Sequence, residues 1–372
     1  MVNATKETEI GVIPADWDVF KLGDYCHIYR GGSPRPIQDF LTKADNGVNW
    51  IKIGDVKPGD KYITSTEERI IPEGVNMSRE VKPGDFILSN SMSFGRPYIL
   101  KIDGCIHDGW LVIQDYQASF EADYLYYLLS SEAVFAQYKK LAAGSGVQNL
   151  NKDIVTEVVL PHPEKDEQIA IAETLSAIDD LITVLEKEIE KKKNIKYGVL
   201  QRLITGEERL SGYTNEWVSI NMSKKSKLKA RIGWQGLTTA EYLESGYSYL
   251  VTGTDFEDGH INWDGCHYVT ADRYYQDPNI QLSNGDVLIT KDGTIGKVAL
   301  VDGLNKPATL NSGVFVVRPI GNAYSARFLY YVLESRVFRD FLDMLSAGST
   351  IVHLYQKDLV NFSFMAPATL EV

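Results

Sequence analysis

The sequence lacks the features of membrane and secreted proteins. No apolar run approaches the roughly 20 residues needed to cross a bilayer, and the N-terminal segment 1–7 has no apolar signal core. The three cysteines are too few, and odd in number, for a secreted disulfide framework, and no two of them have zinc-site spacing. These absences predict a cytoplasmic protein, with no membrane partner, whose cysteines are ordinary buried thiols.

Signatures of catalysis are absent as well. The chain has no glycine-rich loop followed by Lys-Ser or Lys-Thr, no Gly-x-Ser-x-Gly elbow and no His-Glu-x-x-His. The Asn/Asp-Pro-Pro-aromatic motif of amino-methyltransferases is also missing. The sequence therefore favours binding over catalysis. A metal-dependent nuclease using Asp286, Asp292 and Asp302 stays an alternative, although similar carboxylates flank every turn.

Positive charge is scarce. The formal net charge is −12, whereas a basic domain is the usual footprint of nucleic-acid binding. Phosphate contacts depend on local clustering, however, and two stretches offer it, 187–196 and 224–231. A solvated face or a linker is the alternative for each stretch. Net charge by itself therefore leaves a DNA-binding function open.

The most informative feature present is an internal repeat. The segment 84–100 returns at 285–300, and 124–129 returns at 328–333. These copies lie about 200 residues apart, whereas solenoid repeats recur every 20 to 50 residues or so. A length of 372 residues also accommodates two ordinary cores. The pattern predicts duplication of a whole domain.

Each copy is expected to be a mixed domain of the α+β class, with short β-branched and aromatic strands and a helix near its end. The expected strands are 49–53, 85–88, 109–113, 249–251, 286–290 and 313–317, and the expected helices are 121–141 and 323–345. The pairs Tyr126-Tyr127 and Tyr330-Tyr331 could stack on bases. On amphipathic helices they are better interpreted as core and rim residues.

The segment 164–203 is predicted to be one long helix between the copies. A proline stands at its start and Thr205-Gly206 at its end. Its apolar residues recur in alternating steps of four and three, which is the seam of a coiled coil. Some 40 residues at 1.5 Å each give a rod of roughly 60 Å, and the seam requires a partner helix. The seam residues are Ile171, Leu175, Ile178, Ile182, Leu185 and Ile189.

Several motifs together resemble the specificity subunits of type I restriction-modification systems, over nearly the whole chain. The first domain begins with a Gly-Val-Ile-Pro-Ala-Asp-Trp segment at 11–17, which Gly-Tyr-Thr-Asn-Glu-Trp at 212–217 echoes in the second. Glu-Gln-Ile-Ala at 167–170 opens the long helix, and Leu-Ile-Thr-Gly at 203–206 closes it.

The resemblance implies a non-catalytic reader of double-stranded DNA. Two target-recognition domains, 1–160 and 207–372, would each read one half of a split, asymmetric site, and the spacer helix 161–206 would dock methyltransferase subunits. Those subunits bring the S-adenosylmethionine chemistry of DNA methylation, motor-nuclease subunits join them, and this chain binds no cofactor. An assembly adaptor without DNA specificity is the alternative.

One departure from the family concerns the C-terminal end. Family members usually carry a second long helix after the second domain, which packs antiparallel on the first. Aligning Pro161 with Pro367 places Val372 near the start of that helix. The seam is therefore expected to seek another chain, either a second copy or the methyltransferase, because exposed apolar stripes favour association.

Candidate DNA contacts lie in polar loops that recur in both copies, because changed side chains on a duplicated surface would change specificity. Asn and Gln suit adenine, Arg and Lys suit guanine, and hydroxyls suit phosphate. An ordinary polar turn is the alternative for each loop. The candidates are Arg30, Ser33, Arg35, Ser89, Asn90, Ser91, Arg96, Ser145, Gln148, Asn149, Lys224, Lys225, Lys291, Thr294, Lys297, Ser349, Thr350 and His353.

Overall fold

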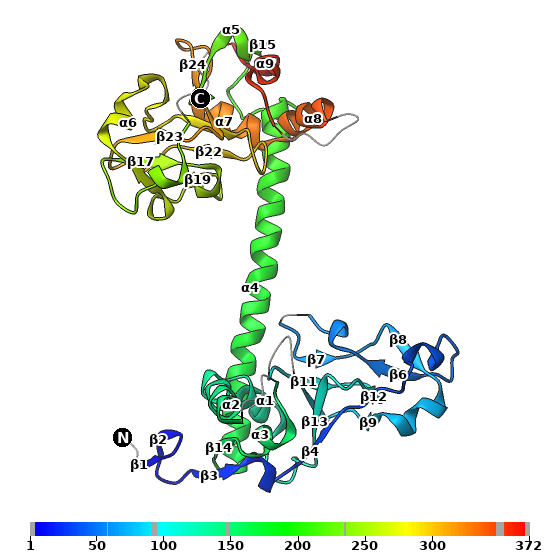
Figure 1. Ribbon diagram of the computed structural model, residues 1–372. Coiled ribbons are helices and arrows are strands. Elements are labelled where there is room, and N and C mark those ends of the chain that lie inside the picture. Colours follow the sequence, from blue (N-terminus) through cyan, green and yellow to red (C-terminus); the bar gives the residue numbers. More distant parts are fainter. Residues whose placement is uncertain are drawn as a thin grey trace. The chain divides into compact units, whose positions relative to one another are not determined.

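The computed structural model describes residues 4–57, 59–90, 95–145, 149–233, 236–346 and 353–368. It divides into two compact units, Met1–Glu186 and Lys187–Val372, which meet inside one long helix. Each unit combines helices with β-sheets (Figure 1), as expected for the α+β class.

The first unit is built on two sheets of five strands each. The central sheet has the order β4-β13-β10-β11-β7, and the outer sheet has the order β5-β8-β6-β12-β9. The strands of the central sheet are β4 (His27–Arg30), β13 (Trp110–Gln114), β10 (Phe86–Ser89), β11 (Pro97–Leu100) and β7 (Tyr62–Ile63). Those of the outer sheet are β5 (Leu41–Thr42), β8 (Glu68–Ile70), β6 (Val48–Ile51), β12 (Gly104–Ile106) and β9 (Arg79–Val81).

The central sheet is covered on both faces, which explains why its strands are apolar without alternation. Phe86 and Leu88 face a core shared with the helices, whereas Ile87 between them faces a core shared with the outer sheet. The covering helices are α1 (Ala122–Leu129), α2 (Glu132–Ser145) and α3 (Lys152–Thr156). Two small sheets complete the unit, β1 (Thr5–Thr8) with β2 (Gly11–Pro14), and β3 (Asp18–Lys21) with β14 (Val159–His162).

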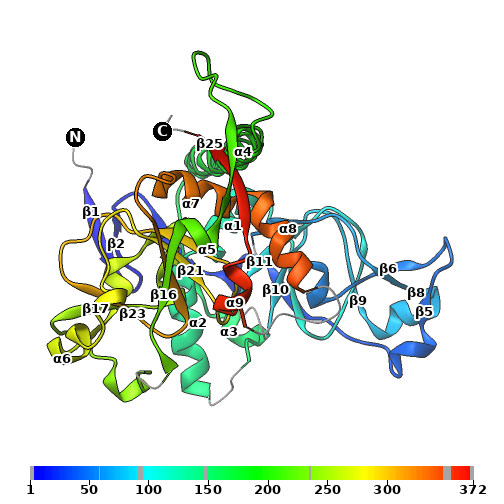
Figure 2. The ribbon, with the colours of Figure 1, turned by 90° about the horizontal axis from the view of Figure 1, so that it is seen from above.

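The second unit repeats this order of elements. Its central sheet is β16 (Ser226–Ala230), β24 (Val314–Pro319), β21 (Val287–Thr290) and β22 (Val298–Leu300), and its outer sheet is β20 (His267–Val269), β17 (Ser248–Val251) and β23 (Ala308–Leu310). Its two-stranded sheets are β15 (Trp217–Asn221) with β25 (Ser363–Pro367), seen side by side in Figure 2, and β18 (Phe256–Glu257) with β19 (His260–Ile261). Its helices are α5 (Met222–Lys225), α6 (Ala271–Tyr275), α7 (Ala326–Glu334), α8 (Arg336–Leu345) and α9 (Gln356–Leu359).

The repeated Gly-Asp pair marks the same turn in both units. Gly84 and Gly285 have φ values of +94° and +92°, a left-handed conformation that favours glycine. The carboxylate that follows accepts a backbone N–H three residues back, from Lys82 to Asp85 at 3.0 Å and from Ser283 to Asp286 at 2.9 Å. The repeat in the sequence is therefore a turn that both domains need to start the strand after it.

The single helix expected near the end of each domain was wrong in both copies. The first is divided into α1 and α2, and the second into α7 and α8. Serine hydroxyls at the breaks accept backbone N–H groups of the next helix, Ser131 from Val134 at 3.3 Å and Ser335 from Val337 at 3.2 Å. Such caps start a new helix, and they outweigh the continuous apolar pattern.

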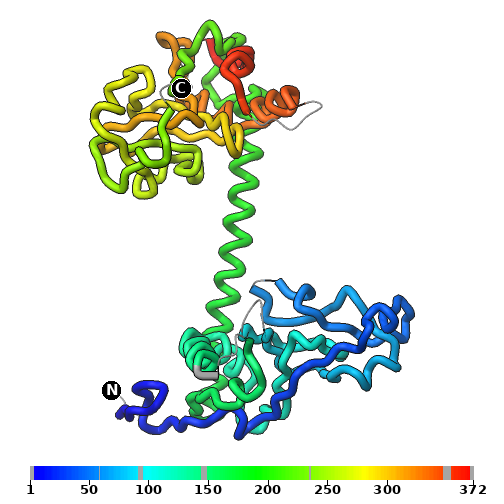
Figure 3. The backbone as a smooth tube through the Cα atoms, in the orientation of Figure 1, coloured from blue at the N-terminus to red at the C-terminus, as the bar shows by residue number. Residues whose placement is uncertain are grey.

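The long helix α4 runs unbroken over Lys165–Thr205 (Figure 3). In the first unit its start is fixed by Gln168, which is fully buried. Its Oε1 accepts the N–H of Glu121 at 2.8 Å, and its Nε2 donates to the carbonyl of Ser119 at 3.1 Å. In the second unit Ile204 is buried in the core. Gly206, with φ +77°, ends the helix as expected for a glycine after the last turn.

Candidate nucleic-acid interface

Equivalent backbone hydrogen bonds bring three segments together in each domain. In the first domain Asn90 N–H donates to Gly109 at 3.0 Å, and its carbonyl accepts from Leu150 at 3.0 Å. In the second, Lys291 makes the same pair of bonds, with Gly313 and Leu354, each at 2.9 Å. The loop after β10 or β21, the start of β13 or β24 and the segment before α3 or α9 therefore meet at one end of the central sheet.

In the first domain four of the predicted polar residues converge on Asp108, which sequence reasoning missed. Its carboxylate accepts from the Ser33 hydroxyl at 2.8 Å and from Arg35 Nη2 at 3.1 Å, and it lies 2.9 Å from Nε2 of His107. Its backbone carbonyl accepts from Arg30 Nε at 3.2 Å. The only sequence signal was its place immediately before the strand at 109–113. We call Asp108 with Arg30, Ser33, Arg35, Asn90 and His107 the Asp108 cluster.

The electrostatics of the cluster keep Asp108 ionised. Partial burial acts to raise its pKa, but the Ser33 hydrogen bond and the charges of His107 and Arg35 outweigh burial, so that the pKa lies below the usual carboxyl value. Arg35 keeps 78% of its side-chain surface exposed. The cluster therefore orients a guanidinium that is still open to a negatively charged ligand.

Two hollows border the Asp108 cluster. One, of about 820 Å³, is lined by Ser33, Arg35 and Asp108 together with Trp50 and Lys52. The other, of about 530 Å³, is lined among others by Arg30, Arg79, Asn90, Asn149 and Lys152. Of its nine lining residues three are cations and one, Asp153, is an anion, and Asn149 is exposed. Exposed positive groups beside a concave surface suit contact with a phosphate backbone.

The other DNA-contact candidates of the first domain differ in how deeply their side chains are buried. Ser89 is completely buried at the end of β10, and Asn90 is only 7% exposed, with its Nδ2 donating to the carbonyl of Asp108 at 3.0 Å. Both therefore support the loop and offer no edge to a base in this structure. Arg96 is half-buried, with its guanidinium carbon 5.9 Å from the centre of the Tyr98 ring.

The second domain carries different side chains on the same framework. His353 Nδ1 pairs with the Asp292 carboxylate, and its ring lies 4.5 Å from that of Tyr355. Thr294 and Lys297 are exposed in the same loop. Lys291 is half-buried, with Nζ 5.4 Å from the Phe315 ring. The candidates at 291–297 and His353, which lie far apart in the sequence, are therefore brought together in space.

Lys224 and Lys225 lie elsewhere on the second domain. They end α5 and are exposed, and the carbonyl of Lys225 accepts from Ile320 at 2.9 Å, just after β24. The loop at Lys291 adjoins the opposite end of β24, where Val314 pairs with Thr290. These two lysines thus form no common surface with Lys291 at one end of the sheet.

The structure does not test some of the predicted DNA-contact residues. Ser91, Gln148, Ser349 and Thr350 lie outside the described residues, and the side chain of Ser145, at the end of α2, is not described.

The aromatic pairs and the cysteines occupy structural positions. Tyr127 donates to the carboxylate of Asp179 on α4 at 2.7 Å, and Tyr330 is 8% exposed in the second core. Cys26, Cys105 and Cys266 are buried free thiols, and burial raises the pKa of Cys26 to about 12. The core and rim interpretation fits both tyrosines.

The carboxylates considered for a nuclease are each engaged by a different basic side chain. Asp286 accepts from Arg318, Asp292 pairs with His353, and Asp302 lies 2.8 Å from Nδ1 of His260. In the described part of the chain no group of three His, Cys, Asp or Glu side chains is arranged to hold a metal ion. Within the same residues, no helix is long and apolar enough to cross a membrane.

The predicted helix seam divides into a covered and an exposed part. Ile171 packs against the first core, and Leu175 is half-buried. The residues that follow keep between 47% and 55% of their surface exposed, although they are large and apolar. They are Ile178, Ile182, Leu185 and Ile189.

The chain is a duplicated domain joined by a long helix. The equivalent polar loops of the two copies carry different side chains. These features define a two-domain recognition protein. The sequence model of the family described as type I restriction modification DNA specificity domain matches residues 14–196 and 237–371. The chain belongs to this family, as the motifs indicated, and it is a non-catalytic specificity subunit of a type I restriction-modification system.

Curated relatives agree with this assignment, and solved structures share the fold. The chain is 22% identical to the type I restriction enzyme MjaVIII specificity subunit of Methanocaldococcus jannaschii, over 95% of this chain and 83% of that protein. It is 31% identical to the MjaIX specificity subunit of the same organism, over 51% of this chain and 43% of that protein. Its fold resembles a chain from a structure of type I R-M complex assembly, with TM-score 0.63, 18% identity and coverage of 96% and 87%. The S subunit from M. genitalium matches with TM-score 0.52, 16% identity and coverage of 95% and 85%.

Proposed function

We propose that this chain reads a split, asymmetric site on double-stranded DNA, with one half-site bound by each domain. The observation that carries the proposal is the pair of equivalent loops. Asn90 and Lys291 make the same two backbone bonds, yet Asp108 and its partners surround one and the His353–Asp292 pair adjoins the other. One framework with two sets of side chains gives two different half-site sequences.

Positioning and reading are assigned to different residues. In the first domain Arg30 and Arg35 bind phosphate, because Asp108 orients both and leaves Arg35 exposed. In the second domain Lys297 and Thr294 are the exposed counterparts. Arg96 and His353 are proposed to face base edges, since half-buried side chains lose less freedom on binding than fully exposed ones.

The partner subunits supply the chemistry in this proposal. Methyltransferase subunits, which bring S-adenosylmethionine, dock on α4, and motor-nuclease subunits complete the complex in the cytoplasm beside the DNA. The exposed seam supports docking, because each such side chain stabilises an interface by roughly 1.5–3 kcal/mol when fully buried. Without its methyltransferase the chain is expected to self-associate through the same seam.

Methylome sequencing of a host that expresses this chain with its methyltransferase tests the proposal. A split adenine-methylated motif with two unlike halves is the expected result. A symmetric motif would mean that one domain is used twice, and the absence of any motif would contradict DNA reading and favour an assembly adaptor.

A matched pair of α4 variants tests the docking surface. Leu185 lies on the seam, and its neighbour Val184 is equally apolar and 59% exposed but lies off the seam. Leu185→Asp is expected to abolish binding of the methyltransferase and self-association at micromolar concentration in sedimentation, whereas Val184→Asp should leave both intact. Equal behaviour of the two variants would contradict the seam as the interface.

A further inference from the structure

The hollow of about 530 Å³ in the first domain gathers positive charge that the chain does not neutralise. Its three cations are Arg30, Arg79 and Lys152, which come from β4, β9 and the start of α3. All three are exposed, and in the described part of the chain none of them forms an ion pair. Asp153 is the single anion of the lining. In a chain with a net charge of −12, this gathering of unpaired cations calls for an anionic ligand.

Arg79 is held by an aromatic ring and not by a carboxylate. Its guanidinium carbon lies 4.7 Å from the centre of the Tyr29 ring. Tyr29 stacks on His27, with the ring centres 6.2 Å apart, and Nδ1 of His27 lies 2.9 Å from the carboxylate of Asp115. Stacking orients a guanidinium without using its N–H donors. Arg79 is therefore oriented in advance and can still bind an anion through hydrogen bonds.

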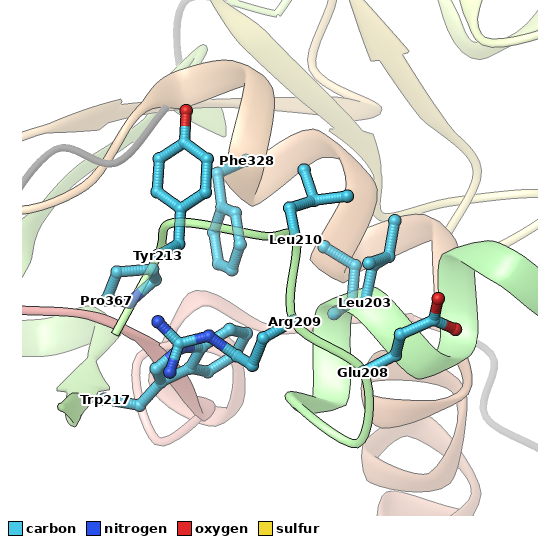
Figure 4. A pocket seen from close by; sticks show the side chains of 9 residues that line it. Leu203, Glu208, Arg209, Leu210, Tyr213, Trp217, Phe328 and Pro367 are labelled. Carbon is cyan, nitrogen blue, oxygen red and sulfur yellow. The ribbon is translucent and has the colours of Figure 1, made fainter. Parts of the chain in front are cut away.

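An arginine of the second domain shows similar stacking in a structural role. The guanidinium carbon of Arg209 lies 5.7 Å from the Trp217 ring, beside a small apolar pocket of about 180 Å³ (Figure 4). Its Nη1 donates to the carbonyl of Asn215 at 3.1 Å, so this side chain is engaged within its own domain. Arg79 makes no hydrogen bond within the described residues. The donors of Arg79 are therefore available to a ligand outside the chain.

The second domain places a cation at the same point by different means. Tyr29 of β4 pairs with Val112, and Lys229 of β16 pairs with Val316. The two valines are equivalent, because each pairs with the third residue after the glycine of the repeated Gly-Asp turn. Lys229, which is exposed, therefore occupies the place of Tyr29. Positive charge is thus retained beside this strand although a different residue carries it.

We propose that the hollow binds a phosphate of the DNA backbone beside the first half-site, with Arg79 as its principal ligand. Arg30 and Lys152 add positive charge, and Tyr29 positions Arg79. A phosphate accepts hydrogen bonds at its free oxygens, which suits a guanidinium with parallel N–H donors. The inference rests on the proposed DNA-reading function and adds a contact that is independent of base sequence.

The test measures binding of the full chain to two DNA duplexes over a range of salt concentrations. One duplex carries the motif found by methylome sequencing, and the other is unrelated. Arg79→Ala should lower the affinity for both by the same factor, roughly three- to tenfold near physiological salt. The slope of log affinity against log salt should fall in magnitude by about 0.9, the contribution of one phosphate. Tyr29→Ala should cause part of this change, whereas Tyr29→Phe, which keeps the ring, should not.

Arg69→Ala is the matched control. Arg69 is exposed on β8, which β6 and β12 separate from β9 in the same sheet. Its replacement removes the same charge and should leave the slope unchanged.

Two results would overturn the phosphate site while DNA reading stands. An unchanged slope in Arg79→Ala would leave Arg79 as a charge that protects an edge strand from pairing. A loss of affinity confined to the duplex with the motif would assign Arg79 to a base edge. If the unaltered chain binds both duplexes equally, DNA reading fails, and the slope of Arg79→Ala still decides the phosphate site. Absence of binding to either duplex would overturn both proposals.

Discussion

The two domains share a backbone framework but stabilise the same turn by different means. In the first, the buried Asp85 accepts from Gln114 Nε2 at 2.5 Å. In the second, Asp286 accepts from Arg318 Nε and Nη2, at 2.6 and 2.5 Å. Both partners lie at the end of the equivalent strand, β13 or β24. Backbone bonds hold the framework, and this leaves side chains free to diverge without loss of the fold.

Replacing Arg318 or Gln114 by alanine should give the largest difference in the free energy of unfolding between the two domains. Arg318→Ala leaves the carboxylate of Asp286, which is 7% exposed, without its counter-charge, and the expected loss is about 3–5 kcal/mol of unfolding free energy. Gln114→Ala removes a neutral donor, and the expected loss is about 1–3 kcal/mol. Denaturant unfolding of each variant measures both values.

Arg336→Ala is the control for loss of an arginine from the second domain. Its ion pair with Asp340 is exposed on both sides, at 76% and 60%, so the change should stay within about 1 kcal/mol. Equal losses for the Arg318 and Gln114 variants would show that the charge on the partner does not matter.

The next largest effect is expected on DNA affinity, and it should depend on which half-site the altered domain binds. Arg96→Ala should weaken DNA binding by about 1–3 kcal/mol through the first half-site, whereas His353→Ala should act through the second. Titrations with DNA altered in one half or the other separate the two contributions. If Arg96→Ala lowers affinity equally for both altered DNAs, its assignment to the first half-site fails.

A smaller effect is expected at the Asp108 cluster, where the acid orients other side chains. Asp108→Ala frees Ser33 and Arg35, and affinity for the first half-site should fall roughly tenfold, or about 1.4 kcal/mol. Ser312→Ala, at the matching position before β24, is the control and should leave first-site binding unchanged. Binding assays at fixed salt compare the two variants.

Lowering the pH should produce the smallest effect, a decrease in the stability of the first domain through protonation of Asp108. Its pKa in the folded chain is lowered, so its contribution to stability is fully present above the ordinary carboxyl pKa and is lost as the pH falls through the lowered value. Partial exposure keeps this contribution small. An acid titration of unfolding should therefore lose part of its pH dependence in Asp108→Asn, and an unchanged curve would contradict this role.

Local patterns in the sequence were sufficient for much of the fold. The Gly-Asp repeat, the apolar strands and the heptad spacing of α4 each depend on neighbouring residues, and all three features are present in the structure. The breaks at Ser131 and Ser335 were missed, because a cap competes with an apolar pattern that continues across it.

The sequence by itself determined the duplication, the long helix and the family, since these depend on residue types at fixed spacings along the chain. Only the tertiary structure selected among the polar residues. It buried Ser89 and joined Ser33 and Arg35 to Asp108 across the strands. Such contacts join residues that lie far apart in the chain, and only sheet register and packing decide which of them meet.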